Sequence, residues 1–114
     1  MKVIRNSVIP FKGFLAINLF GIAFVRKEYW EKKDAWHKRK CIIHESIHTA
    51  QMKEMLYVFF YIAYFFEWLY WLVVRPSSAY RCISFEVEAY RHEGDEEYLQ
   101  NRKMFAQWRK IEQK

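Results

Sequence analysis

The sequence predicts an α+β fold that is mostly helical, in which a short N-terminal β-hairpin or sheet precedes three helices. β-branched and aromatic residues concentrate near the N-terminus, whereas the thirty-four residues from Cys41 to Val74 contain neither Gly nor Pro. Three Gly and two Pro in 114 residues leave little room for loops, and we expect disorder only in the tail Arg109–Lys114. A chain of this length has room for one domain, over 1–114.

The strands are expected within residues 15–26. Residues 14–25 are largely β-branched, aromatic or apolar and are interrupted at Asn18–Gly21. This pattern predicts two short strands, Leu15–Leu19 and Ile22–Arg26, or one strand with a bulge at Gly21.

Three helical segments follow, at residues 35–55, 56–74 and 79–100. Asp34 is the expected N-cap of the first, because its short side chain can accept a hydrogen bond from the first turn. The second ends at Arg75, since Pro76 disfavours helix at the residue before it. Ser77 or Ser78 can then cap the third helix.

The first of these helices carries an HExxH motif, His44-Glu45-Ser46-Ile47-His48. On a helix, residues i and i+4 share a face, so both imidazoles can reach a single ion. Glu45 projects toward the same ion, where it can accept a proton from zinc-bound water and return it to a leaving amine. The motif therefore predicts Zn²⁺ as cofactor, His44 and His48 as ligands and Glu45 as catalytic base. The alternative is a pair of surface histidines on an ordinary helix.

A catalytic zinc site has three protein ligands and one open position, so a third ligand must come from elsewhere in the chain. Glu86, on the helix expected over 79–100, is the first candidate, and Glu88 and Glu93 are alternatives. Glu86 shares a helix face with Tyr90 and Glu93, whereas Glu88 points about 160° away. Charged residues on a helix are more commonly its solvated side, which is the structural alternative for all of them.

An HExxH motif followed some tens of residues later by ExxA resembles the gluzincin zinc metallopeptidases. The resemblance is closest to the compact minigluzincins and to integral-membrane peptidases that process prenylated or misfolded membrane proteins. It implies hydrolysis of peptide bonds in peptide or protein substrates, with Glu86 of Glu86-Val87-Glu88-Ala89 as the third zinc ligand. In the family an Asp follows the Ala and orients a histidine ligand; Tyr90 stands there in this chain, so Tyr90 or Glu93 is expected to take that part.

Two further implications come from resemblance. In gluzincins a strand beside the active-site helix binds substrate as an added strand, which would here be the region Leu15–Arg26. Longer motifs are similar to small proteins of Bacteroidetes-type bacteria, from which no function can be carried over. These motifs are Ile17–Gly21, His44–Gln51 and Tyr80–Tyr90.

The segment 56–74 allows three interpretations: a transmembrane helix, a helix in the membrane interface, or a buried core helix. It is nineteen residues long and apolar or aromatic everywhere except at Glu67, and about 20 such residues span a bilayer. We expect Glu67 to have an internal partner, such as Arg81 or a lysine. The segment carries one aromatic stripe, formed by Tyr57, Tyr61, Tyr64, Trp68 and Trp71.

The predicted metal site requires this helical region to bend. A straight helix from His48 to Val74 would be about 39 Å long, and the twelve residues from Val74 to Glu86 recover only about 18 Å. We therefore expect a bend between Met52 and Phe66, which no Gly or Pro marks.

The net charge of +6 concentrates between Arg26 and Lys40, where seven basic residues stand against three acidic ones. Such a cluster fits an anionic membrane surface or a solvated basic loop. Nucleic acid is not expected as a partner, because no helix-turn-helix, RNP or zinc-finger pattern accompanies the charge. No signal peptide is evident and the two cysteines, Cys41 and Cys82, form no disulfide framework, so the cytoplasmic side is the expected location.

Together these patterns predict a zinc metallopeptidase that hydrolyses extended substrates near a membrane surface. The alternative is a non-catalytic, membrane-associated protein that keeps a metal for stability or sensing. The fourth coordination position distinguishes the two, since closure by His37, His92 or a cysteine would indicate a structural metal.

Overall fold

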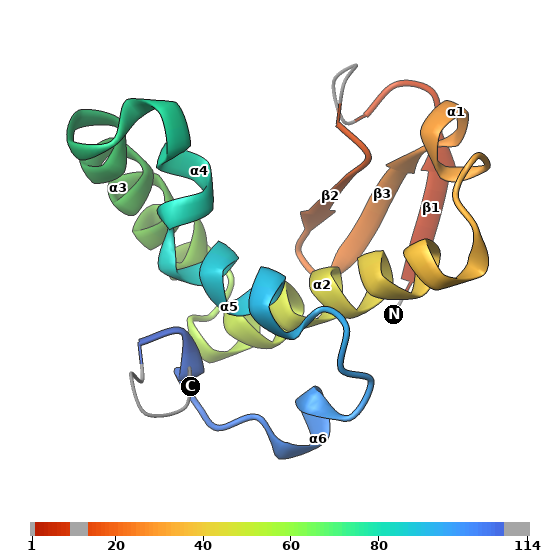
Figure 1. The fold of residues 1–114 in the computed structure, drawn as a ribbon. Helices are drawn as coiled ribbons and strands as arrows, with labels where there is room; N and C mark the ends of the chain where they lie inside the picture. The colour runs from red at the N-terminus through yellow and green to blue at the C-terminus, as the bar shows by residue number, and fades with distance from the viewer. Residues whose placement is uncertain (1, 10–13, 109–114) are drawn as a thin grey trace.

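The computed structural model describes residues 2–9 and 14–108 (Figure 1). The predicted α+β class is confirmed, because a small N-terminal sheet precedes a helical half. In Figure 1 the molecule has two arms, the sheet on one side and helices α3 and α4 on the other, joined by α2 and α5. The tail Arg109–Lys114, for which the sequence predicts disorder, lies outside the described residues.

The sheet contains β1 (Lys2–Asn6), β2 (Ala16–Leu19) and β3 (Ile22–Arg26) in the order β1-β3-β2. β2 and β3 form the predicted hairpin, whose turn at Phe20 and Gly21 has positive φ at both residues, as two-residue hairpin loops require. β1 pairs parallel with β3 and was not predicted. Its only adjacent apolar residues are Val3 and Ile4, between charged neighbours, which is too short a run to give a strand signal.

After the short helix α1 (Lys27–Trp30), α2 spans Ala35–Glu54, where the sequence predicts helix over 35–55. The Asp34 carboxylate accepts a hydrogen bond of 2.9 Å from the backbone N–H of His37 and so caps α2 as expected. The buried residues of this helix are mainly polar: His44, Glu45, Ile47, His48, Gln51 and Met52. A helix that buries polar groups needs partners for them, and these partners form the candidate site.

A turn at Leu56 and Tyr57 ends α2 and leads into α3 (Val58–Val74) at an angle of 110°. This is the bend predicted between Met52 and Phe66. Both turn residues have positive φ, 54° and 60°, which costs a bulky residue about 1–3 kcal/mol. The Tyr57 N–H compensates in part by donating to the Met52 carbonyl at 2.7 Å.

The aromatic stripe of α3 faces the protein interior. Tyr57, Tyr61, Tyr64, Trp68 and Trp71 all pack against a buried cluster of Met52, Phe60, Ile83 and Phe85. Among the residues the structure describes, no single helix is both long and apolar enough to cross a membrane, and α2 with α3 meets that measure only as a bent pair.

The single helix predicted over 79–100 is wrong. The chain instead forms the 3-10 turn η1 (Pro76–Ser78), α4 (Ala79–Cys82), α5 (Ser84–His92), α6 (Tyr98–Asn101) and the 3-10 turn η2 (Ala106–Trp108). Ile83 breaks the helix with an extended backbone, φ −60° and ψ 130°, while its side chain is fully buried in the core. Packing of Ile83 thus overrides the local helical preference. Ser78 occupies the N-cap position of α4 but makes no side-chain cap.

Glu67 caps α5 from the neighbouring helix α3. Its carboxylate accepts 2.7 Å hydrogen bonds from both the N–H and the hydroxyl of Ser84, and a longer one from the Trp108 indole. The expected internal partner is confirmed, but it is Ser84 and not Arg81 or a lysine, because the unpaired N–H group at the start of α5 supplies a donor. Arg81 instead stacks on the Tyr90 ring at 3.7 Å.

We predict that Glu67→Ala lowers the free energy of unfolding by about 1–2 kcal/mol, because the Ser84 N–H at the start of α5 loses its acceptor. Glu31→Ala is the matched control, since Glu31 is an exposed glutamate in the turn after α1. Urea unfolding followed by circular dichroism measures both. Equal midpoints for the two variants would contradict the capping role.

Candidate metal centre

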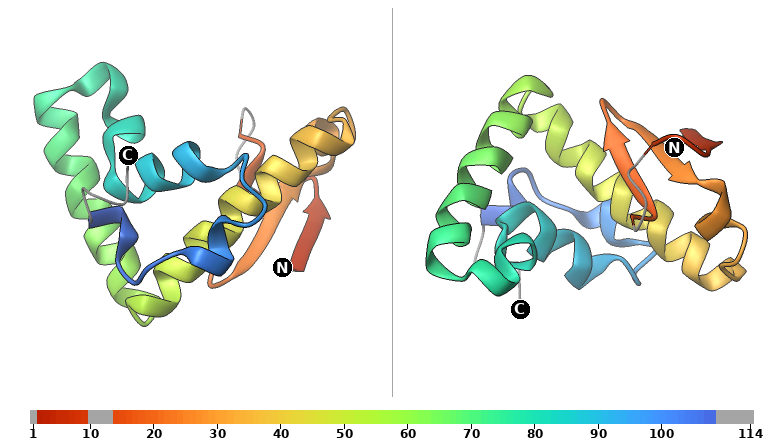
Figure 2. Two further views of the ribbon diagram at one scale, coloured as in Figure 1. Left: turned by 60° about the horizontal axis from the view of Figure 1, so that its bottom comes forward. Right: turned by 90° about the horizontal axis from the view of Figure 1, so that it is seen from above.

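Helices α2 and α5 lie side by side (Figure 2) and bring three predicted ligand residues together. One oxygen of Glu86, Oε1, lies 3.1 Å from Nε2 of His44 and 3.2 Å from Nε2 of His48. All three side chains are buried, and their ligand atoms lie within 4.8 Å of one another. Two imidazole nitrogens and one carboxylate oxygen are a donor set that suits zinc and other divalent transition metals. The residues therefore form a group that could hold a metal ion.

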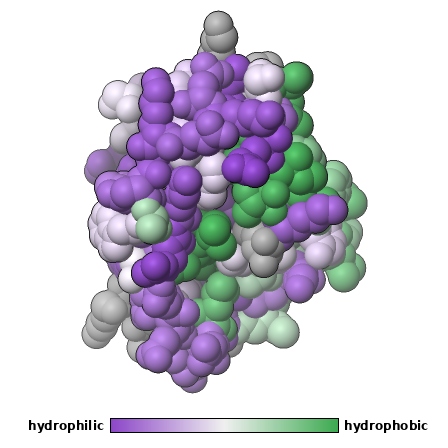
Figure 3. Space-filling view, turned by 90° about the vertical axis from the view of Figure 1, so that its right-hand side faces the viewer, coloured by the Kyte–Doolittle hydropathy of each residue, from purple (hydrophilic) through white to green (hydrophobic). Residues whose placement is uncertain are grey.

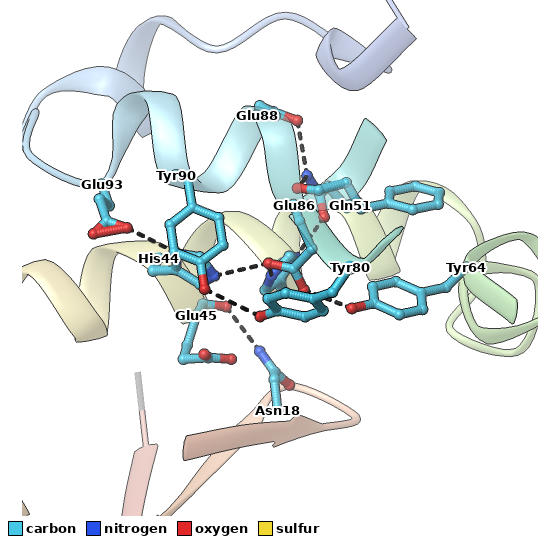
Figure 4. A network of polar contacts seen from close by, with 12 residues as sticks. Asn18, His44, Glu45, Gln51, Tyr64, Tyr80, Glu86, Glu88, Tyr90 and Glu93 are labelled. Atoms are coloured by element: carbon cyan, nitrogen blue, oxygen red, sulfur yellow. Dashed lines mark hydrogen bonds and ion pairs between the residues drawn. The ribbon is translucent and has the colours of Figure 1, made fainter. Parts of the chain in front are cut away.

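The alternative third ligands have other partners. Glu93 accepts from Nδ1 of His44 at 3.2 Å, so it can orient that ring, as the sequence leaves open for Tyr90 or Glu93. The contact of Tyr90 with His44 is between rings, whose centroids lie 4.5 Å apart (Figure 4). Glu88 faces away from the centre and pairs with Arg102.

The centre stabilises positive charge. Burial disfavours charge on His44, but hydrogen bonds with Glu86 and Glu93 outweigh it and raise the pKa of His44 to about 9. Burial also opposes ionisation of Glu86, yet the attraction of His48 and hydrogen bonds from both histidines hold its pKa well below the usual range. A dication would take the place of the protons on these imidazoles, and the same carboxylates would stabilise it.

Glu45 lies beside this group and faces open space. The residue is only 8% exposed, and burial raises the pKa of its carboxyl group. Glu45 lines two cavities, of about 350 Å³ and 430 Å³. Asn18 of β2 donates from its side-chain amide to the Glu45 carbonyl at 2.7 Å, which fixes the sheet against α2 (Figure 4).

Gln51 is a site residue that the sequence reasoning missed. Its Oε1 accepts from Nδ1 of His48 at 2.8 Å, and its amide N–H groups donate to the carbonyl of Phe85 and to Glu88. Holding the proton on Nδ1 leaves Nε2 of His48 as the atom directed at the ligand group. The signal was present, because Gln51 follows His48 by three residues and so shares its helix face.

Tyr64 and Arg102 were also missed, and no local pattern indicates them. The Tyr64 hydroxyl donates to the second oxygen of Glu86 at 2.7 Å, which holds the carboxylate orientation. Arg102 pairs with both Glu88 and Glu54 and so closes the network behind Gln51. Both contacts join segments that are far apart in the sequence.

Closure of a fourth coordination position by His37, His92 or a cysteine would indicate a structural metal. Within residues 2–9 and 14–108, none of these residues belongs to the group that could hold a metal ion. His37 pairs with Asp34 at the start of α2, and His92 stacks on Tyr98. Cys41 lines the larger cavity, and burial raises the pKa of its thiol to about 12. Cys82 lies near Ser78.

Comparison of the chain with protein-family models, with curated proteins and with solved structures found no match. The gluzincin assignment therefore stays a prediction from the sequence motifs, and the structure adds only that His44, His48 and Glu86 form a group that could hold a metal ion.

We predict that the purified protein binds about one zinc ion per chain and that His44→Ala or Glu86→Gln weakens binding at least about 100-fold. His37→Ala is the control, because His37 lies on the same helix outside the group. Equilibrium dialysis with elemental analysis gives stoichiometry and affinity. Unchanged affinity in Glu86→Gln would identify a different third ligand.

Proposed function

We propose that this protein is a zinc-dependent peptidase of the gluzincin type. The supporting observation is that His44, His48 and Glu86 form one buried group directly beside Glu45, which lines both cavities. A zinc ion held there would supply Lewis-acid chemistry, polarising a carbonyl group and making water more acidic.

Glu45 is the proposed general base. Its neighbour in the chain is a metal-ligand candidate, and its side chain lies where the two cavities meet. From this position it can accept a proton from water and return it to the leaving amine. Glu45 is largely buried, which strengthens any electrostatic interaction with a reacting group.

Tyr80 is the proposed hydrogen-bond donor to the reacting carbonyl. It lines both cavities, and its hydroxyl lies 3.2 Å from that of Tyr90. A hydroxyl there can donate a hydrogen bond to an oxyanion that develops during attack on a carbonyl. Tyr64 has a different part, because its hydroxyl is engaged by Glu86.

The edge strand β2 is the proposed substrate-binding element. It pairs with β3 on one side only, and Ala16, Ile17 and Asn18 line the smaller cavity. An extended peptide can add to such an edge through backbone hydrogen bonds. The Asn18 contacts with Glu45 and Thr49 hold the strand at a fixed position relative to the base.

We also propose that the protein works at an anionic membrane surface. The outer face of α3 has no charged residue and consists of exposed Val58, Phe59, Ile62, Phe65, Phe66, Leu69, Tyr70, Leu72, Val73 and Val74. An exposed apolar face of this kind marks an interaction site. Exposed Lys53 and Arg75 flank α3, and the net charge of +6 favours anionic lipid over a second copy of the chain.

The second candidate function, a non-catalytic membrane-associated metal protein, predicts a closed fourth position. The two cavities beside Glu45 favour an enzyme, because they give a substrate access to the centre.

We predict that Glu45→Gln retains zinc but loses peptide hydrolysis by about 1,000-fold or more, because an amide cannot accept the proton. A quenched-fluorescent peptide library detects cleavage, with Glu31→Gln as the matched control at an exposed glutamate. Equal rates in the wild type and Glu45→Gln would exclude Glu45 as the base. Absence of cleavage in the zinc-loaded wild type would favour the non-catalytic alternative.

We predict that the protein sediments with vesicles containing anionic phospholipid and that salt weakens this binding. The double variant Phe66→Glu/Val73→Glu should bind about tenfold more weakly, since both side chains are on the outer face of α3. Val8→Glu/Met104→Glu adds the same charge at exposed apolar residues elsewhere. Equal sedimentation of both double variants would contradict a role for α3, and a concentration-dependent dimer in its place would assign this face to a second copy.

A further inference from the structure

The two cavities that Glu45 lines share part of their walls and differ in chemistry, and we infer that they are the two halves of one groove. We propose that this groove selects a peptide with an apolar side chain on one side of Glu45 and a carboxylate on the other. The inference rests on the proposed function, whose substrate class it specifies.

The two halves of the groove are neighbours, because four residues line both. Phe14, Ala16, Glu45 and Tyr80 line both cavities. Ile17 and Asn18 line only the smaller cavity, and Leu15 lines only the larger one, so the segment leading into β2 runs along the whole groove. A peptide added to this edge advances about 3.3 Å per residue, and one short segment therefore reaches both halves.

The smaller half is apolar and aromatic. Besides the shared residues it is lined by Ile17, Met52, Phe60 and Tyr61, together with polar groups of the metal centre. Met52 and Phe60 belong to the buried core, which makes this wall rigid. With a volume of about 350 Å³, this half can take an apolar side chain of the substrate.

The larger half carries charged side chains of both signs, with its basic residues at one end. Lys33, His37 and Lys40 line it, together with Cys41, His44, Tyr90 and the acidic Glu45 and Glu93. These three basic residues belong to the cluster between Arg26 and Lys40, in which seven basic residues stand against three acidic ones. Figure 3 views the side of the molecule that carries α1 and the start of α2, where hydrophilic side chains form a broad area beside a hydrophobic one.

The ion pairs at this end leave Lys33 as the main contact for an anion. Lys40 lies 3.6 Å from Glu93 and over the Trp36 ring, and His37 pairs with Asp34. Glu93 is also engaged by His44, which reduces its repulsion of an incoming carboxylate. Lys33 is exposed and has no ion-pair partner within residues 2–9 and 14–108. A substrate carboxylate would pair with Lys33.

Two sources can supply this carboxylate: an acidic side chain within a longer chain, or the C-terminal carboxylate of the substrate. Both present the same anion to Lys33. They differ in the substrate that they imply, because a C-terminal carboxylate ends the chain at this point, whereas an acidic side chain allows it to continue. The experiment therefore compares peptides that carry one, the other or neither.

The test measures binding in the zinc-loaded Glu45→Gln protein, where cleavage does not interfere. Three fluorescein-labelled hexapeptides share one Phe: one has a Glu and an amidated C-terminus, one a free C-terminal carboxylate and no Glu, and one neither charge. Fluorescence anisotropy should show that at least one carboxylate peptide binds about fivefold more tightly than the neutral peptide. The tighter of the two identifies the source.

Variants assign the preference to the two halves. Lys33→Glu should abolish the advantage of the carboxylate peptide, whereas Lys53→Glu, at the far end of α2, should preserve it. Ile17→Asp should weaken binding of all three peptides, because each carries the Phe and the substitution places a charge in the apolar half. Circular dichroism melting verifies that each variant is folded.

Equal affinity for the three peptides, or an unchanged preference in Lys33→Glu, would overturn the proposal, as would the absence of peptide binding. A carboxylate preference lost in Lys33→Glu supports it even when the wild type cleaves none of the peptides. In that case the groove assignment holds and the peptidase proposal fails, so the two results are distinguishable.

Discussion

The contact of one carboxylate oxygen with two imidazoles is the constraint around which this chain is arranged. Glu86 follows His48 by 38 residues, and its Oε1 must nevertheless reach Nε2 of both histidines on α2. The chain meets this requirement by turning through 110° at Leu56 and Tyr57, despite the unfavourable backbone conformation there. The break at Ile83 and the cap that Glu67 provides then direct α5 back along α2.

The second requirement is energetic, because burying charged groups is costly unless each finds a partner. Glu88 and Gln51 are fully buried, and they pair with each other and with Arg102 and His48. This explains why the segment after α5 runs past α2: it delivers Arg102 to Glu54 and Glu88. The network fixes the orientation of His48 before any ion binds, which favours a preorganised centre.

The sequence predicts correctly those features of the site that depend on residues close together in the chain. The spacing of His44 and His48 predicts a shared helix face, and Asp34 predicts the start of that helix. Glu86 is the first of several candidates for the third ligand, and the resemblance to gluzincins favours it, while a length argument predicts the bend without locating it. Its position could not be predicted because Leu56 and Tyr57 adopt positive φ without the Gly or Asn that normally marks such a turn.

The remaining features depend on contacts between distant segments. β1 forms a strand because β3 offers it an edge, and Ile83 leaves the helix because its side chain fills the core. Glu67 accepts a hydrogen bond from the backbone at the start of α5 and does not pair with a basic residue. Gln51 shares the helix face of His48, but its orientation depends on its hydrogen bonds to Phe85 and Glu88. Patterns of period 2 or 3.6 carry no information on such pairings.

Helix α3 connects the proposed membrane surface with the proposed substrate groove. Its inner face contributes Phe60, Tyr61 and Tyr64 to the apolar half of the groove, while its outer face is exposed and apolar. Tyr61 also joins α3 to the hairpin, since its hydroxyl donates to the Asn18 carbonyl and accepts from the Phe20 N–H. A bilayer that holds the outer face would therefore also fix the position of the groove wall and of the β2 edge.

The two halves of the groove lie toward different parts of the molecule. The apolar half lies toward α3, whose outer face is also apolar, and the half that contains Lys33 and Lys40 lies toward the basic start of α2. This arrangement suits a substrate whose apolar part lies nearer the membrane than its carboxylate.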